Sequence, residues 1–393
     1  MTNTSVVIRC GTGMDDKDFE VVERKGIGHP DTVADGISMA CSVALMNRYL
    51  LEYGTMKHFN VDKVLISAGK STATFGHGKI LSPIKVFISG RASPCEGLHR
   101  LLEHTTKKYI DSLFPLIPKK GLKVKSLVQE GSRDLVYGCF DRKGEFPKAN
   151  DTSIGVGYAP FSSLEKAVQQ IEGIIHNRTS SGMVGNDVKI MGIRTGNNID
   201  LIISVAMIAK NIKNRGIYDQ VKKDITKMIE CHLPRLVDFP FQIREVRINA
   251  ADTDDSPYLT VIGGSMENGD DGMTGRGNKI NGLITPCRTM TMEAAAGKNP
   301  INHVGVLYNL VAKDCAFEIY ERFKDEIKEA KVILVSKIGQ SINDPSAIKV
   351  GIKTNGNLFN HYKGDILQII YDRLQRINEY KDRIMEGHIN RLF

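Results

Sequence analysis

The chain of 393 residues contains no tryptophan, and aromatic side chains make up only 7% of it. Its Lys and Arg residues alternate with acids, so it lacks the basic runs and basic-aromatic clusters that bind nucleic acid. Its seven cysteines are scattered without a CxxC pair, which indicates reduced thiols rather than disulfide bridges or a zinc site. The net charge of +8 therefore favours small anionic ligands.

Long hydrophobic runs are also missing. The longest apolar run, at 201–209, is far too short to span a bilayer, and the N-terminus lacks the apolar core of a signal peptide. We therefore expect a cytoplasmic protein that binds neither membrane nor nucleic acid. The length favours two or three domains.

Periodic apolar residues predict alternating strands and helices. Helices are predicted at 31–53, 163–177, 217–232, 303–329 and 365–383. Strands are predicted at 64–68, 84–89, 188–193, 199–207, 243–248, 258–262 and 332–335. Residues 107–125 are the most irregular stretch. Strands followed by long helices recur, which indicates repeated α/β units.

The segment 266–305 combines paired carboxylates, fixed cations and several glycines. Its charged candidates are Asp270, Asp271, Arg276, Lys279 and Lys298. Carboxylates bind hard cations, Lys and Arg neutralise phosphate oxygens, and glycines let backbone N–H groups approach an anion. The segment therefore indicates a site for a metal-bound polyphosphate, with a polar surface loop as the alternative.

A second candidate begins at His29-Pro30-Asp31. Pro30 suits the first turn of a helix, so His29 is expected at the helix entrance, beside the positive end of the dipole. Asp31 and Asp35 are expected on one helix face, where Asp31 could bind a cation. An acid that merely stabilises the first turn is the alternative.

Two further acidic residues could contact a ligand. Asp151 lies in an Asn-Asp turn, which is the commoner explanation for it, but it could accept hydrogen bonds from a ligand amine. Asp187 and Lys189 alternate onto one side of a predicted strand, so they could meet one ligand or form a salt bridge.

Two nucleotide motifs are incomplete. The segment ending in Gly69-Lys70-Ser71 resembles the end of a P-loop, but Val64 occupies the place of its first glycine. Gly155 and Gly157 begin a GxGxxG pattern in which Pro160 replaces the last glycine. Neither a P-loop nor a dinucleotide fold is supported.

Taken in order, the motifs resemble the archaeal-type S-adenosylmethionine synthetases (methionine adenosyltransferases). The matching blocks are GIGHPDTVADGI (26–37), ANDTSIGVGYAP (149–160), GNDVKIMGIR (185–194), YLTVIGGSMENGDDGMTGRGNKINGLITP (258–286), MEAAAGKNPINHVG (292–305) and SKIGQSINDP (336–345). The resemblance extends from about residue 23 to about residue 345, and the last fifty or so residues match only in general character.

The resemblance implies a fold of three similar, interlaced α/β domains around a pseudo-threefold axis. The expected domains are 1–26 with 162–265, 27–135 with 266–306, and 136–161 with 307–393. It also implies a homodimer with active sites between subunits. In the family, methionine sulfur attacks C5′ of ATP and expels triphosphate, which the same site cleaves to diphosphate and phosphate. Mg²⁺ is required, and K⁺ commonly activates relatives.

The resemblance also implies roles for the candidate residues. His29 resembles the family's histidine near the ester oxygen, and Asp31 a magnesium ligand that Asp270 or Asp271 would complement. Lys189, Arg276 and Lys298 resemble cations that bind phosphate, with His29, Lys189 and Arg276 as the catalytic group. The remaining expected contacts to ATP or methionine are Asp151, Asp187, Lys279, Asn60, Asp62 and His303.

Some positions depart from the family's pattern, in blocks thought to shape the side that binds the sulfur substrate. They are Phe59, Val61, His77, Arg133 and Tyr137. Two alternatives therefore stand beside the synthetase. One displaces triphosphate with a different nucleophile, or releases it without methionine. The other is a homologue that binds without turnover, which the retained cations argue against.

Overall fold

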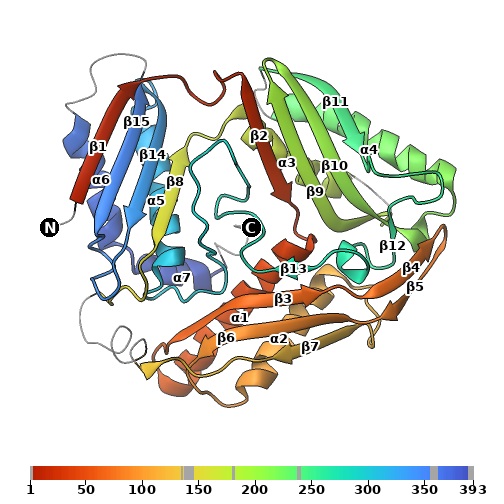
Figure 1. The fold of residues 1–393 in the computed structure, drawn as a ribbon, viewed down its shortest axis with the longest axis horizontal. Coiled ribbons are helices and arrows are strands. Elements are labelled where there is room, and N and C mark those ends of the chain that lie inside the picture. The colour runs from red at the N-terminus through yellow and green to blue at the C-terminus, as the bar shows by residue number, and fades with distance from the viewer. Residues whose placement is uncertain are drawn as a thin grey trace.

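The computed structural model describes residues 3–133, 136, 146–178, 182–236, 240–354 and 362–387. Three sheets of four, five and four strands, each backed by helices, lie around the middle of the molecule (Figure 1). This mixed α/β architecture confirms the expected fold class. None of the helices in the described part is both long and apolar enough to cross a membrane.

The first sheet draws strands from both ends and the middle of the chain. Its strands, in spatial order, are β1 (Asn3–Cys10), β15 (Ala347–Thr354), β14 (Ile327–Val335) and β8 (Ile154–Ala159). The C-terminal helices are α5 (Val304–Phe323), α6 (Lys363–Gln375) and α7 (Glu379–Met385). β8 packs directly on α5, because a Cβ atom at Gly157 would lie 2.2 Å from the backbone of Ala312. The incomplete GxGxxG pattern is therefore a packing feature.

The second sheet is built from adjacent parts of the chain. Its strands, in spatial order, are β11 (Gln242–Ile248), β10 (Asn198–Ile208), β9 (Val184–Thr195) and β2 (Phe19–Lys25), with β12 (Leu259–Thr260) beside β10. The helices α3 (Ser163–Arg178) and α4 (Arg215–Leu236) cover it. A separate core fills the space between this sheet and its helices.

The third sheet lies below the other two in Figure 1. Its strands, in spatial order, are β13 (Gly272–Met273), β3 (Phe59–Ser67), β6 (Ile84–Ala92) and β7 (Leu122–Ser126). It is covered by α1 (Pro30–Tyr53) and α2 (Leu98–Leu113), and the ribbon β4 (Lys70–Thr74) and β5 (His77–Ser82) extends beyond it. One continuous hydrophobic core serves the first and third sheets.

Helix α1 begins and ends as its sequence predicts. His29 is the N-cap, its Nδ1 accepting a hydrogen bond from the Asp31 N–H, and Pro30 occupies the first turn. Gly54 ends the helix in the left-handed conformation (φ +65°), which glycine adopts without strain.

Three secondary-structure predictions are wrong at particular places. The helix predicted at 303–329 stops at Phe323, and 327–329 already belong to β14. The helix predicted at 365–383 divides into α6 and α7. The irregular stretch 107–125 holds the end of α2 and most of β7. Tertiary pairing decided these segments more than local periodicity did.

The limits of the three domains stay a prediction. The sheets themselves place β1 parallel to β15, with Val6 opposite Val350, whereas β2 pairs with β9. The first strands of the chain therefore belong to two different sheets.

Candidate functional site

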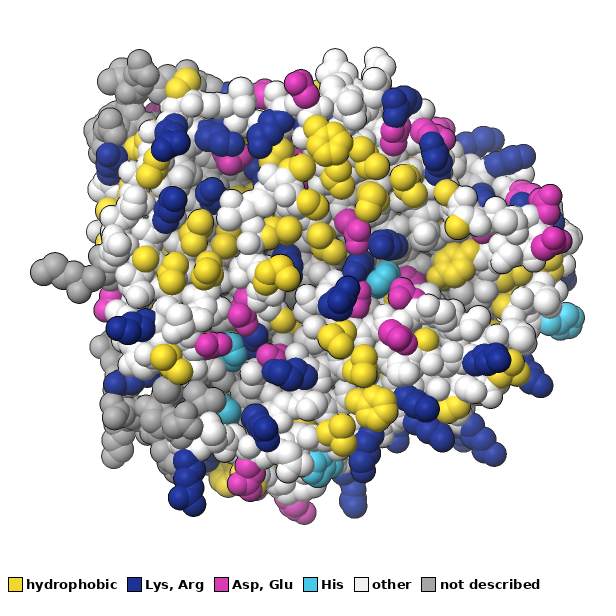
Figure 2. Space-filling view, in the orientation of Figure 1, with side chains coloured by type: hydrophobic (Ala, Val, Ile, Leu, Met, Phe, Trp, Pro, Cys, Tyr) yellow, Lys and Arg dark blue, Asp and Glu magenta, His cyan; other side chains and the backbone are white. Residues whose placement is uncertain are grey.

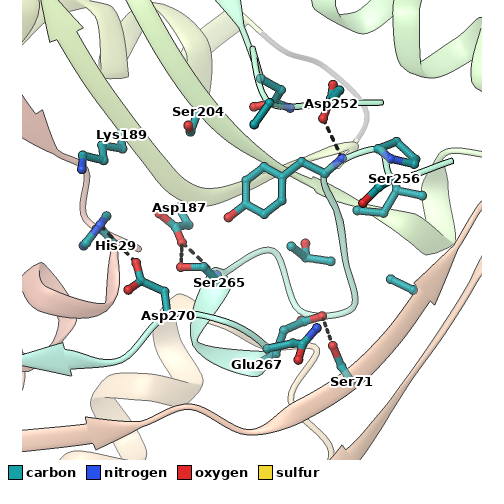
Figure 3. A pocket seen from close by; sticks show the side chains of 18 residues that line it. His29, Ser71, Asp187, Lys189, Ser204, Asp252, Ser256, Ser265, Glu267 and Asp270 are labelled. Atoms are coloured by element: carbon teal, nitrogen blue, oxygen red, sulfur yellow. Dashed lines mark hydrogen bonds and ion pairs between the residues drawn. The ribbon is translucent and has the colours of Figure 1, made fainter. Parts of the chain in front are cut away.

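An open cavity of about 540 Å³ lies where the second sheet, the start of α1 and the ribbon β4–β5 meet. His29, Asp187, Lys189 and Asp270 line one end of it (Figure 3). Its opposite wall is the segment 249–260, which carries Tyr258. The prediction that Asp187 and Lys189 share one side of a strand is confirmed, because both line this cavity from β9.

His29 presents one ring nitrogen to the cavity. Its Nδ1 accepts the Asp31 N–H at 3.2 Å, so in the neutral ring the proton resides on Nε2, 3.6 Å from Oδ2 of Asp270. Burial, followed by the nearby charges of Lys25 and Lys189, lowers the pKa of His29 to about 4. The side chain is therefore a neutral hydrogen-bond donor at pH 7.

Asp31 is paired with a lysine that the sequence reasoning missed. Lys25 Nζ donates to Asp31 Oδ2 at 2.8 Å and to the Arg276 carbonyl at 2.8 Å, while the Met273 N–H donates to Asp31 Oδ1 at 2.9 Å. Lys25 ends β2, immediately before the turn that leads to His29. One ammonium group thus ties the predicted metal ligand to the segment that bears Arg276.

Asp187 is held by its contacts with Ser265. Its Oδ2 accepts the Ser265 N–H at 2.8 Å and the Ser265 hydroxyl at 2.5 Å, and burial raises its pKa to about 6. Lys189 lies more freely, since its Nζ is 3.7 Å from Glu23 and its side chain is 42% exposed. This cation is available to an anionic ligand.

The two paired carboxylates differ in their surroundings. Asp270 is half exposed and faces His29, and burial together with nearby Asp31 raises its pKa. Asp271 instead accepts the Ala68 N–H at 2.7 Å and holds the turn after β3. Asp270 is therefore the better partner for Asp31 in binding a cation.

Arg276 lies at an exposed turn and does not line the cavity, although its carbonyl accepts a hydrogen bond from Lys25. Its neighbour Gly275 has φ +85° and donates its N–H to Asp35 Oδ1 at 2.8 Å. Asp35 is fully buried, and burial followed by nearby Asp31 raises its pKa to about 7. Asp35 thus fixes the turn that bears Arg276, while Asp31 lies buried behind the cavity end in contact with Lys25.

A second group of predicted residues lies elsewhere, around Lys298. The buried Lys298 ammonium is 3.3 Å from Asp62 Oδ2 and contacts Glu293, and its backbone forms a bridge with Asn60. Burial acts to raise the pKa of Asp62, but the charge of Lys298 together with the hydrogen bond and charge of Lys63 outweighs it, and the pKa lies below its ordinary value. None of these four residues lines the cavity beside His29.

His303 caps α5 as His29 caps α1. Its Nδ1 accepts the Gly305 N–H at 3.2 Å, and burial, followed by the charge of Lys298, lowers its pKa to about 3. This residue belongs to the Lys298 group. Its contacts indicate a structural cap close to a charged cluster.

Asp151 and Lys279 border the Lys298 group. Asp151 is exposed and its Oδ1 accepts the Thr152 N–H at 2.7 Å, while Ser153 two residues on donates to Glu293 at 3.0 Å. Lys279 is half-buried and lines a small cavity with Glu293 on one side and Asp35 on the other, so it lies between the Lys298 group and the His29 end. The other predicted residues fall into two groups on one chain.

The departures from the family pattern fall mainly outside both groups. Phe59 and Val61 are fully buried on the inner face of β3, and the Phe59 ring lies 6.3 Å from that of Tyr49. Asn60 and Asp62 alternate with them toward the Lys298 group. The structure thus places Phe59 and Val61 in the core rather than at a substrate.

The other departures differ in position. His77 and Arg133 are exposed, His77 at the tip of the β4–β5 ribbon. Tyr137 lies outside the described residues. None of the four described departures lines the cavity beside His29.

Comparisons with known proteins agree with one another. A family model described as S-adenosylmethionine synthetase (AdoMet synthetase) matches residues 3–388. The S-adenosylmethionine synthase of Pyrobaculum aerophilum is 42% identical over 388 residues, covering 94% of this chain and 95% of that relative. The S-adenosylmethionine synthase of Methanobrevibacter smithii is 39% identical over 391 residues, covering 96% of each chain.

A solved structure also resembles this fold. It is that of an unusual S-adenosylmethionine synthetase from Campylobacter jejuni, with a TM-score of 0.59 and 15% identity. The match covers 96% of this chain and 100% of that chain. At this identity the likeness bears on the fold alone.

Proposed function

Because this chain belongs to the S-adenosylmethionine synthetase family, we propose that it joins ATP and L-methionine to S-adenosylmethionine, with phosphate and diphosphate as the other products. The observation that carries the proposal is the end of the cavity where His29 Nε2, Lys189 and Asp270 meet. A neutral hydrogen-bond donor, a partly exposed cation and a carboxylate are what a departing polyphosphate and its metal ion require.

The proposed reaction needs positioning rather than a protein nucleophile. Methionine sulfur forms a bond to C5′ of ATP while the bond from C5′ to the triphosphate oxygen breaks, and that oxygen keeps the electron pair. His29 would donate a hydrogen bond from Nε2 to the departing oxygen. Lys189 and Arg276 would neutralise the growing charge on the phosphates. Water then cleaves the triphosphate.

Mg²⁺ would be held by Asp31 and Asp270. These carboxylates are close enough for Asp31 to help raise the pKa of Asp270, and a cation that took the place of the Lys25 ammonium beside Asp31 would relieve that repulsion. Among the described residues, no group of three or more His, Cys, Asp or Glu side chains could hold a metal ion. Phosphate oxygens would complete the coordination, as is usual for Mg²⁺. The bound ion would neutralise phosphate charge. The expected K⁺ stays a prediction.

A second copy of the chain is part of the proposal. The two groups of predicted residues are separate in one chain, and a homodimer would bring the Lys298 group of one subunit against the His29 cavity of the other. Hydrophobic side chains gather on the sheet face that the helices leave open (Figure 2). Strand residues with a large exposed fraction are Phe19 (52%), Ile154 (45%) and Met273 (45%).

The register of the second sheet supports this surface. Val21 lies opposite Ile193, and Met191 lies opposite Ile202, all four on the face that α3 and α4 do not cover. Such apolar rows are typical of homodimer interfaces. Sedimentation of the purified protein would test this part of the proposal, with a dimer as the expected result.

The activity is tested by incubating purified protein with ATP, Mg²⁺ and K⁺, with and without methionine, and identifying the products by mass spectrometry. We expect S-adenosylmethionine, diphosphate and phosphate in equal amounts, formed only when methionine is present. Release of triphosphate without S-adenosylmethionine would contradict the proposal and indicate another acceptor. A protein that binds ATP but consumes none would indicate a homologue without turnover.

A further inference from the structure

One buried hydroxyl group organises the wall of the cavity opposite His29. Tyr218, on α4, is fully buried and does not line the cavity. Its hydroxyl donates to Asp252 Oδ2 at 2.7 Å and accepts from Asn249 Nδ2 at 3.0 Å and from the Tyr258 N–H at 3.1 Å. The three residues that it contacts all line the cavity. Tyr218 is thus the common partner of three points along that wall.

Asn249 fixes one end of the wall to the second sheet. It is buried and has φ +49°, a left-handed conformation that asparagine tolerates better than most residues. Its Oδ1 accepts the Val205 N–H at 2.7 Å and its Nδ2 donates to the Val205 carbonyl at 3.0 Å. The side chain therefore continues the ladder of β10 where the backbone has turned away.

Asp252 fixes the other end. Its Oδ1 accepts the Tyr258 N–H at 2.9 Å, and its Oδ2 also accepts Lys222 Nζ at 2.7 Å. Tyr258 then extends toward the reactive end, since it is close enough to Asp187 for that charge to raise its pKa further than burial already does. A shift of the segment 249–258 would therefore change the contacts that a ligand makes in the cavity.

We propose that Tyr218 is a positioning residue for nucleotide binding. Its hydroxyl holds the wall of residues 249–258 in the conformation that binds ATP. The inference rests on the proposed function, since ATP is the ligand assigned to the cavity. The hydroxyl itself touches no ligand, because Tyr218 lies behind the wall. Its loss should weaken ground-state binding while leaving His29, Lys189 and the metal ligands in place.

The test is Tyr218→Phe, with Tyr380→Phe as the matched control. Tyr380 is also buried and donates its hydroxyl to an aspartate, Asp314, at 2.8 Å, but it lies in α7 away from the cavity. Both variants lose one buried tyrosine hydroxyl, so a purely structural role would affect both alike. We expect the KM and the calorimetric Kd for ATP to rise roughly tenfold in Tyr218→Phe alone, with kcat within about twofold.

A second pair of variants covers the case that Tyr218→Phe does not fold. Asp252→Asn keeps an oxygen for the Tyr258 N–H, although its amide NH2 replaces the oxygen that accepts Tyr218 and Lys222, whereas Asp252→Ala removes both oxygens. The Asn variant should therefore retain more ATP affinity than the Ala variant. Unchanged ATP affinity in Tyr218→Phe, or equal losses in Tyr218→Phe and Tyr380→Phe, would overturn the positioning role alone. Failure of the wild-type protein to bind ATP would overturn the proposed function, and this inference with it.

Discussion

Lys189→Ala should lower turnover strongly while changing folding stability little. The Lys189 side chain is 42% exposed and its ammonium is 3.7 Å from the nearest carboxylate, that of Glu23. An ion pair this exposed contributes less than about 1 kcal/mol to folding, because water screens it and holding the side chain costs entropy. A cation that meets growing phosphate charge in the transition state contributes more, on the order of 100-fold in kcat.

The assay is S-adenosylmethionine formation, measured beside the melting temperature of the same preparation. Lys353→Ala is the matched control, because Lys353 Nζ lies 3.1 Å from Glu329 with its side chain 32% exposed, on a different sheet. We expect roughly 100-fold lower kcat in Lys189→Ala and nearly wild-type turnover in Lys353→Ala, with similar small changes in melting temperature. Matching losses of turnover and stability in Lys189→Ala would show that Lys189 is a structural ion pair and refute the reasoning.

Three further predictions concern buried charges. Lys298→Met takes the ammonium away from buried Asp62, which keeps only the exposed Lys63, and from partly exposed Glu293, so unfolding should become easier by about 3 kcal/mol in urea titrations, more than in Lys189→Ala. Arg288→Met should cost about as much, because its guanidinium is nearly buried and bonded to Glu165 and Glu329, whereas the exposed Arg247→Met should change little. The pKa of Asp35 in the folded protein, about 7, lies above the ordinary carboxyl pKa of 3.8 that applies to the unfolded chain. The folded protein therefore binds the extra proton, and wild-type stability should fall as pH rises from about 4 to about 7. Asp35→Asn should lack that fall and be more stable than wild type at pH 8, and a parallel pH dependence in the two proteins would contradict this.

Local chemistry made part of the site predictable from sequence. A His-Pro-Asp run fixes a helix start, so the position of His29 as the N-cap followed from residue types alone. Asp187 and Lys189 are two apart in a strand, and the two-residue period of strands placed both on one side. Such features depend only on neighbours in the chain.

Contacts between distant segments could not be predicted in the same way. Lys25 reaches the Arg276 carbonyl across 251 positions of sequence, and Tyr218 reaches Tyr258 from another element. Lys25 is the last residue of β2, and the residues next to it in the sequence form no motif that indicates a contact with a ligand or with Asp31. The burial of Phe59 and Val61 could not be predicted for a related reason, since sequence likeness marks a block but not which face of β3 points to the core.

The split of the candidate residues into two groups was also beyond the sequence. The segment 266–305 reads as one continuous site, yet Asp270 lies at the His29 cavity and Lys298 lies beside Asp62. The chain between them folds back through several turns, including one at Gly275. Closeness in sequence therefore wrongly predicted one site, because the backbone changes direction several times between Asp270 and Lys298.

The measurement that tests the central claim most directly is the single-turnover rate of S-adenosylmethionine formation in His29→Asn, compared with wild type between pH 5 and 8. Asparagine is a good N-cap, so α1 should keep its start while the Nε2 donor is lost. For His29→Asn we predict a rate at least about 100-fold lower at every pH. In the wild-type protein we predict no change of rate caused by titration of His29 between about pH 5 and 8, because burial lowers its pKa to about 4. An unchanged rate in a folded His29→Asn protein would contradict the account, because the cavity beside His29 would then not be where triphosphate leaves.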